Sequence, residues 1–546
     1  MSNSVFISFV IRLFHGLNYW YEYSGTFKVL NKIKTMALNS FIMGNIWRSF
    51  TTTHHNNYAD GSLFIKFIFG AGALVFGALK SIFLFFARLN DTSINKKITA
   101  AITGPFRDTN VGVVGFISRT VAGCFPSKFA VWLFTNEKSQ SDSEGSFITL
   151  RLMFCVFVLG FSIIPHHLWS NMLILGAALF FWGAFALQYF LSENKPGVDT
   201  KYIAPSLVLY VFFCVVSFFT GFGGFDSVRV ASIMFSSIAI GLLIPNIFTT
   251  KEQLKQLIIF VFVALVLSSL FGLYQAHMGI AIREDFVDMW ANIGMPGRLY
   301  STMGNPNNFA KFLIMLLPFC IAHMFIAKCE IKKLFLLGLN GIILIAMVLT
   351  FSRASYLALG GVFGVLVLLL KPRLIPIGIL GAIIAIPFLP DVIINRIMTI
   401  GTDTSSLYRV LIWEGAARTV ANYWSSGIGI GPDAFTSIYR AHAASTAGNA
   451  MHAHNVFLNV WVEVGIGGFI AIILYNLKTF KTGVATFYKT QDIEIKYYLA
   501  AGVSALTAFL MFSIVEHVWF YPRTMLTYFV MMGIIWALIR IETRAQ

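Results

Sequence analysis

Long apolar segments restrict the fold of this chain more than any other feature of its sequence. From residue 147 onward there are twelve of them, each about 17 to 25 residues long, which is enough to cross the hydrocarbon core of a bilayer as an α-helix. In a helix every backbone polar group is satisfied within the segment itself. The predicted spans are residues 147–164, 168–191, 202–219, 229–247, 253–276, 309–327, 333–350, 354–370, 373–390, 456–477, 497–516 and 523–541.

The composition agrees with a membrane location. The chain of 546 residues is 57% hydrophobic and 12% charged, whereas soluble domains are about 45 to 50% apolar. A net charge of +16 would suggest nucleic acid in a soluble protein, but here an excess of Lys and Arg is the usual orientation signal of cytoplasmic loops. We therefore predict an all-α polytopic membrane protein that contacts membrane lipids and no nucleic acid.

The cysteines give no sign of a disulfide framework or a metal site. They form no CxxC pair and do not have metal-ligand spacing. Most lie in or beside apolar segments, so we predict that they are buried small apolar side chains, and we expect no metal and no cofactor. The five are Cys124, Cys155, Cys214, Cys320 and Cys329.

Lysine positions predict the orientation of the spans. Of the thirteen lysines after residue 147, twelve fall in alternate loops, which are therefore predicted to be cytoplasmic together with the C-terminus. The exception is Lys311. The opposite, extracytoplasmic side would carry residues 277–308, a short turn with Ser352 and Arg353, and a large loop over residues 391–455.

Residues 1–146 do not continue this pattern. They contain one plausible span near 63–87, a weaker apolar region around 111–134, and an aromatic, basic beginning typical of an interfacial amphipathic segment. The polar linker NEKSQSDSEGS at 136–146 marks a boundary. We predict an N-terminal extension, 1–146, with interfacial helices or one to two extra spans, and a twelve-span membrane domain, 147–546.

Three polar stretches on the predicted outer side have structural interpretations. The sequence SLYRVLIWEGAARTVANYW, which contains Arg409, predicts a surface helix. GIGIGPDAF at 427–435 lacks the strand and the βαβ unit that a nucleotide-binding fingerprint needs, so we predict a tight re-entrant turn. GNPNN at 304–308 is predicted to end a loop and begin a helix.

The stretch MHAHNVFLNVWVEVGIGG, residues 451–468, places His452 and His454 where the large loop returns to a span. The two histidines lack a third ligand at sensible spacing, which disfavours a metal. A structural imidazole and a general base both remain open, because the unperturbed imidazole pKa of about 6.5 suits proton transfer near neutral pH. Glu463 lies about two turns into the following span, where a carboxylate requires a partner.

Two arginines lie at the predicted outer mouths of spans, Arg298 in GRLYSTMGNPNNFA and Arg353 in TFSRASYLALGG. A guanidinium keeps its charge and grips phosphate through a planar fork, so these residues are candidate diphosphate ligands. The alternative is an arginine that reaches toward lipid head groups. Together with His454 they form a more specific set than any one of them alone.

These segments resemble the O-antigen ligase and polymerase family of bacterial glycan assembly over roughly residues 250–475. His454 and Asn455 are followed by nine residues, Gly465, two residues and Gly468, which agrees with the family's pattern. The resemblance implies a GT-C-like membrane glycosyltransferase with about twelve helices and a large outer loop. It implies that His454 is catalytic and that Arg298 and Arg353 hold the donor diphosphate; Arg283 is an alternative to Arg298. Supporting candidates are Arg409, His452, Asn455 and Glu463.

The function that this resemblance implies is glycan transfer at the outer face of the bacterial cytoplasmic membrane. The donor would be an undecaprenyl-diphosphate-linked glycan, and the reaction would be inverting and independent of metal. The motifs describe the donor side only, so the acceptor stays open between a second glycan (polymerase), a lipid A-core (lipopolysaccharide ligase) and a protein hydroxyl (oligosaccharyltransferase). A transporter of lipid-linked or anionic solute and a non-catalytic envelope scaffold are the alternatives from other classes.

Overall fold

The computed structural model describes residues 148–191, 205–280, 297–385, 387, 390–398, 401 and 403–545. Contacts divide the chain into two compact units, and the account below concerns the first, to which most of the described residues belong. The predicted extension 1–146 lies outside the described residues, as does Arg283.

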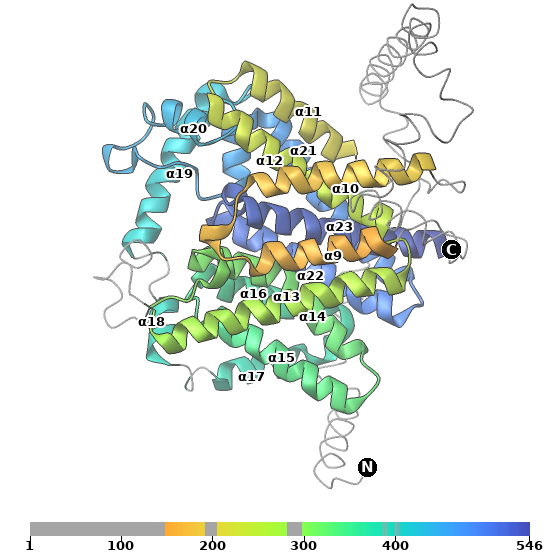
Figure 1. Ribbon diagram of the computed structural model, residues 1–546. Coiled ribbons are helices and arrows are strands. Elements are labelled where there is room, and N and C mark those ends of the chain that lie inside the picture. The colour runs from red at the N-terminus through yellow and green to blue at the C-terminus, as the bar shows by residue number, and fades with distance from the viewer. Residues whose placement is uncertain are drawn as a thin grey trace, which may run out of the picture. The chain divides into compact units, whose positions relative to one another are not determined.

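All regular structure in the described part is helical, and a helix occupies each of the twelve predicted segments. The helices, shown in Figure 1, are α9 (Ile148–Ile163), α10 (Met172–Leu191), α11 (Pro205–Thr220), α12 (Phe225–Ile247), α13 (Lys251–Met278), α14 (Pro306–Ile326), α15 (Glu330–Val348), α16 (Arg353–Leu370), α17 (Ile375–Ala385), α18 (Asp391–Met398), α19 (Thr404–Tyr423), α20 (Pro432–Tyr439), α21 (Val456–Lys489), α22 (Ile493–Val515) and α23 (Pro522–Ala545). Short 3-10 turns, among them Ser301–Met303 and Val518–Phe520, connect some of them.

Among the described residues, eight helices are long and apolar enough to cross a membrane, namely α12 to α16 and α21 to α23. The protein is therefore a polytopic membrane protein, as predicted. Four further apolar stretches, in α9, α10, α11 and α17, are shorter, so twelve spans remain a prediction; they are Leu150–Ile163, Met172–Phe185, Pro205–Thr220 and Pro372–Gly381.

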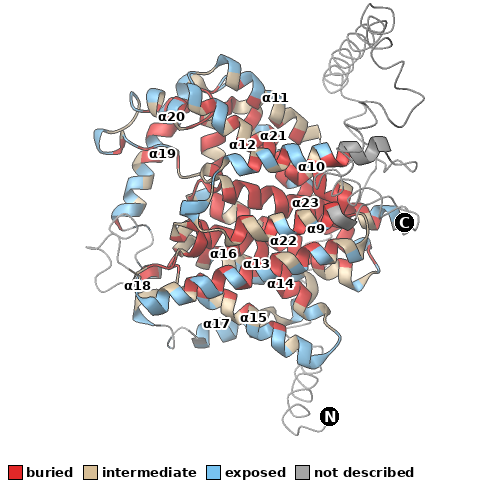
Figure 2. Cartoon of the chain, viewed as in Figure 1, coloured by how far each residue is buried: buried red, intermediate tan, exposed pale blue. Residues whose placement is uncertain are grey.

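The core of the unit is built around α14, α22 and α23. The apolar stretch of α23 is 100% buried and that of α14 is 89% buried, whereas the stretch of α15 is only 28% buried. Figure 2 shows this contrast between buried α22 and α23 and the mixed surface of α15. Leu334, Phe335 and Leu337 of α15 are exposed, which is the arrangement expected of side chains that face lipid.

The sequence signals for helix starts are confirmed at α14 and α19. Asn305 caps α14 by accepting hydrogen bonds from the backbone N–H groups of Asn307 and Asn308, and Pro306 occupies the first turn, as the GNPNN stretch predicts. The predicted surface helix in the large loop is α19, which Asp403 caps. The loop over 391–455 is therefore largely helical in its described part.

A cysteine prediction is wrong. Cys155, Cys214 and Cys320 are buried as expected, but Cys329 is exposed, and Cys124 lies outside the described residues. Cys329 stands in the short connection that directly precedes α15. Connections run over the surface of a protein because their backbone groups need water or polar partners.

Helix α21 is broken at Gly465, which adopts φ 79° and ψ −179°, a conformation that glycine alone reaches at low cost. Residues 427–431 fill the break, and the Gly429 N–H donates to the Glu463 carbonyl at 3.1 Å. A Cβ atom on Gly427 would lie 2.3 Å from the Glu463 carbonyl oxygen. The glycine run therefore permits close backbone packing against a broken helix.

Two ion pairs join the beginnings of α13 and α22. Lys251 Nζ lies 2.7 Å from Asp492 Oδ2, and Lys255 Nζ lies 2.9 Å from Glu494 Oε2. The four side chains are between 24% and 32% exposed. Exposed pairs of this kind contribute little to stability, typically about 0 to 1 kcal/mol.

Candidate functional site

His454 stands directly before α21 on a backbone that three side chains fix. Its own N–H donates to His452 Nδ1 at 3.2 Å, and the Ala453 N–H donates to Asn459 Oδ1 at 3.0 Å. Asn455 caps the helix by accepting from the Leu458 N–H. His454 has φ 46°, which is uncommon for a residue other than glycine and is found chiefly where the surroundings enforce it.

Glu516, at the end of α22, faces the His454 imidazole. Its Oε1 lies 3.7 Å from His454 Nδ1 and 2.5 Å from the Arg409 guanidinium, and its Oε2 lies 3.2 Å from Lys311 Nζ. The distance to His454 is longer than a hydrogen bond, but such contacts often tighten when substrate binds. Burial raises the pKa of Glu516, but the charges of Lys311 and Arg409 outweigh it and hold that pKa well below its usual range. The group is therefore a carboxylate at neutral pH.

Lys311 was the one lysine that departed from the alternate-loop pattern, and its place in the structure explains why. Its side chain is only 3% exposed and is paired with Glu516, which is 8% exposed. A buried cation of this kind belongs to a local ion cluster and carries no information about orientation. Glu516 itself was missed, although it is an acidic residue at the end of predicted span 497–516, on the same predicted side as His454.

Three arginines surround the turn between α15 and α16. Arg353 at the start of α16 binds Asp403 Oδ2 at 2.6 Å, which joins α16 to α19. Arg298 donates through Nε to the Thr350 carbonyl at 2.8 Å, and Arg396 of α18 donates to the carbonyl of Phe351 at 3.1 Å. The structure thus brings Arg298 and Arg353 together, and it adds Arg396, which sequence reasoning did not select.

These cations repel one another and lie in a buried setting. Burial, reinforced by the charge of Arg396, lowers the pKa of Arg298 to about 9. Burial and the charge of Arg353 likewise lower the pKa of Arg396 to about 10. Both guanidinium groups remain charged near neutral pH.

Five basic side chains meet around Asp403 and Glu516, and we call them the basic cluster. They are Arg298, Lys311, Arg353, Arg396 and Arg409. Among the described residues, these five cations surround two carboxylates. Preorganised cations in a site from which water is largely excluded stabilise a developing negative charge far more than the same charges in water.

A layer of aromatic rings lies behind His454. The ring centroid of His452 lies 4.2 Å from that of His454, 4.2 Å from that of Phe520 and 5.3 Å from that of His517. Burial, together with neighbouring positive charge, lowers the pKa of His517 to about 3 and places the pKa of His452 well below its usual range. Both rings are neutral at pH 7, so the layer supports His454 without adding charge.

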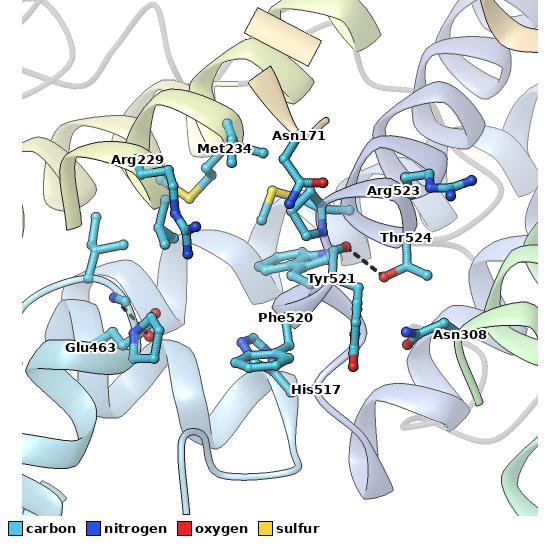
Figure 3. A pocket seen from close by; sticks show the side chains of 18 of the residues that line it. Asn171, Arg229, Met234, Asn308, Glu463, His517, Phe520, Tyr521, Arg523 and Thr524 are labelled. Carbon is cyan, nitrogen blue, oxygen red and sulfur yellow. Dashed lines mark hydrogen bonds between the residues drawn. The ribbon is translucent and has the colours of Figure 1, made fainter. Parts of the chain in front are cut away.

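Glu463 lies apart from this cluster. Its Oε1 accepts a hydrogen bond from the Gly431 N–H at 3.2 Å, which gives the carboxyl group the partner that its position requires. Glu463 instead lines a cavity of about 230 Å³, which His517 and Phe520 also line. Figure 3 shows Glu463 and Arg229 on one side of this cavity and Asn308, Tyr521 and Thr524 on the other.

The part of the chain that the structure describes contains no group of three or more His, Cys, Asp or Glu residues arranged to hold a metal ion. The site is instead defined by His454, the basic cluster and Glu516. They are held by the ends of several helices of a polytopic membrane protein.

Residues 338–473 match the model of a family described as O-antigen ligase, which confirms the resemblance to that family over this segment. The segment contains Arg353, Arg396, Arg409 and His454, whereas Arg298, Lys311 and Glu516 lie outside it. No curated protein matches the chain.

Proposed function

We propose that this protein transfers a glycan from an undecaprenyl-diphosphate donor to a hydroxyl of an acceptor at the outer face of the bacterial cytoplasmic membrane. The acceptor is a second glycan or a lipid A-core, as for a surface polysaccharide polymerase or an O-antigen ligase. The observation that carries the proposal is the position of His454 beside Glu516 at the edge of the basic cluster.

His454 is the general base in this proposal. Glu516 faces Nδ1 of the imidazole, so Nε2 is the nitrogen that takes the proton from the acceptor hydroxyl. The hydroxyl oxygen then attacks the anomeric carbon, the bond from that carbon to the diphosphate oxygen breaks, and the electron pair leaves with the lipid diphosphate. Attack opposite the leaving group inverts the anomeric configuration. Glu516 would orient the ring and stabilise the imidazolium, as a base-orienting carboxylate does.

The basic cluster stabilises the leaving diphosphate. Arg409 and Arg353, whose side chains are 21% and 10% exposed, are the members best placed to contact it. Arg298, anchored on the Thr350 carbonyl and on Asn307, contributes its charge and holds the turn. Because arginine supplies charge and a hydrogen-bonding fork together, the reaction needs no metal ion.

The test compares purified wild-type protein with His454→Ala, each given an undecaprenyl-diphosphate glycan pool and candidate acceptors. Release of free lipid diphosphate and formation of a larger glycan are measured. Loss of a general base costs about 10² to 10⁴ in rate, so the variant should lose both signals. The matched control is His442→Ala, which removes an imidazole that bonds Asn422 and Ile438 in the same outer loop. Equal activity of wild type and His454→Ala would refute the mechanism.

The proposed orientation has its own test. Reporter fusions within the loop 391–455 and at the C-terminus should report the extracytoplasmic and the cytoplasmic side, respectively. The reverse result would place the site on the wrong face for a donor exposed at the outer leaflet.

A further inference from the structure

The cavity lined by Glu463 and Phe520 is not used by the mechanism above, and its lining combines polar and apolar side chains. Side-chain amides of Asn171 and Asn308, the carboxyl group of Glu463 and the guanidinium of Arg229 contribute hydrogen-bonding groups. Aromatic rings, including those of Phe520 and Tyr521, contribute flat apolar faces. Sugar rings present hydroxyl groups at their rim and C–H groups on their faces, so this combination suits carbohydrate.

Two residues that line the cavity each carry a buried polar atom without a hydrogen-bond partner in the described part of the chain. The atoms are Nδ2 of Asn308 and Nδ1 of His517, on residues that are 2% and 7% exposed. Buried polar groups are nearly always paired, because leaving one unpaired costs about 1 to 3 kcal/mol. Asn308 Nδ2 can only donate a hydrogen bond, whereas His517 Nδ1 belongs to a neutral ring and donates or accepts according to its tautomer. A ligand hydroxyl group that comes within hydrogen-bonding distance of either atom would give it a partner.

Residues that line the cavity also contact residues of the site at His454. The Asn308 side chain accepts a hydrogen bond from Lys311 Nζ at 3.4 Å, and Lys311 pairs with Glu516. His517 follows Glu516 in the chain, and Phe520 packs on His452. Figure 3 shows His517 and Phe520 between the two polar walls. Phe520 and His517, which line the cavity, and His452 behind them therefore stand between the cavity and His454.

The volume of the cavity and the charges of its lining restrict the class of ligand further. The volume of about 230 Å³ is below the roughly 300 to 1,000 Å³ of sites for drug-sized molecules, which suits one ring. Arg229 is paired with Asp226 at 2.7 Å, and Arg523 donates to the carbonyls of Phe161, Ile164 and Thr302. Both cations therefore already have acceptors, so the lining does not favour an acidic sugar.

We propose that this cavity binds a neutral pyranose ring of the glycan substrate, one that neighbours the sugar reacting at His454. This inference rests on the proposed function. The cavity would then be a specificity-determining subsite. By binding the neighbouring ring, it would determine which glycan places its reacting sugar next to His454. The ring comes from the donor glycan or from the acceptor glycan, and the kinetic measurement below distinguishes the two.

The first experiment measures binding without catalysis. Methyl glycosides of glucose, galactose, N-acetylglucosamine and glucuronic acid are offered to the full-length His454→Ala protein in detergent, and saturation transfer from protein to sugar is recorded by NMR. We expect transfer to at least one neutral glycoside and its loss in His454→Ala combined with Asn171→Trp, which fills the cavity from a surface turn. Absence of transfer to every glycoside, preference for the glucuronide, or undiminished transfer in the filled variant would overturn the inference.

A second, smaller change tests the subsite even if the Asn171→Trp variant does not fold. Arg229→Ala removes a cavity-lining guanidinium whose side chain is 53% exposed. Loss of a hydrogen bond from a charged group should weaken neutral-sugar binding about tenfold or more. Arg418→Ala is the matched control, because it removes an arginine that is 57% exposed and also forms a local ion pair, but away from the cavity. Equal binding by the two single variants would count against the subsite.

The second experiment uses the otherwise wild-type enzyme. Asn171→Trp should raise the KM of one glycan substrate with a much smaller change in kcat, and the substrate affected supplies the ring. Unchanged KM values for both substrates would refute the subsite. Because sugar binding is measured in a protein without its catalytic histidine, a failure of the proposed mechanism leaves the binding result intact, and the two failures can be told apart.

Discussion

At the beginning of α22, Asp492 and Glu494 each pair with one lysine of α13, and these side chains remain partly exposed. At the other end of the same helix, Glu516 is buried and touches Arg409 and Lys311, with further arginines beyond them. We call the first the balanced end, because each carboxylate there has one lysine, whereas at the other end Glu516 is shared by two cations. The contrast separates ion pairs that join two helices from the cluster to which the proposed function assigns the leaving diphosphate.

The largest expected effect comes from Glu516→Gln, which removes the buried carboxylate shared by Lys311 and Arg409. Breaking a buried ion cluster by removing one partner costs about 3 to 5 kcal/mol, and thermal unfolding in detergent at pH 7 should show a loss of this order. Asp492→Asn, at the balanced end, should cost much less, since its side chain is 32% exposed. Equal losses in the two variants would remove the distinction between the ends.

The contribution of Glu516 to stability should also depend on pH. The folded pKa of Glu516 lies below the unfolded value, which is about 4.3. Its stabilisation is therefore fully present above that pH and is lost as the pH falls through the folded pKa. The stability difference between wild type and Glu516→Gln should narrow as the pH is lowered below about 4. A difference that stays constant down to pH 3 would mean that the carboxylate charge is not what stabilises the cluster.

The next largest effect is expected for Arg353→Lys. Lysine keeps the charge near Asp403 but loses the planar fork, so glycan transfer should fall about tenfold to a hundredfold. Transfer is measured as release of lipid diphosphate. Arg418→Lys, at an exposed pair on α19, should leave the rate unchanged, and full activity of Arg353→Lys would exclude the fork from the mechanism.

A small effect is expected at the balanced end. Lys255→Gln breaks the pair with Glu494 and should lower the free energy of unfolding by less than about 1 kcal/mol. Glycan transfer should not change. A marked loss of activity with intact folding would mean that this end of the protein also takes part in the reaction.

No effect is expected from chelation. If the basic cluster supplies the charge that stabilises the leaving diphosphate, transfer after treatment with EDTA should equal that of untreated enzyme. A strict requirement for added Mg²⁺ or Mn²⁺ would indicate that arginine charge alone is insufficient.

The sequence was sufficient to predict the positions of the helices, because a long apolar segment predicts a membrane helix without information from the rest of the chain. His454 could be selected as a candidate, since it lies within a local pattern whose Gly465 marks the break in α21, and its role stays a prediction. Glu516 could not be found in this way. Its partner Arg409 is 107 residues distant, and only the packing of α14, α19 and α22 shows that their charges meet.

The left-handed backbone of His454 also determines which substitutions report on chemistry. Asparagine adopts this conformation several-fold more readily than most residues, whereas a β-branched residue there is strongly disfavoured. His454→Asn therefore removes the base while it preserves the entry into α21, and His454→Val disturbs both. A mutational scan at this position would rank residues by backbone tolerance as well as by proton transfer, so the asparagine variant is the one whose inactivity can be attributed to the imidazole.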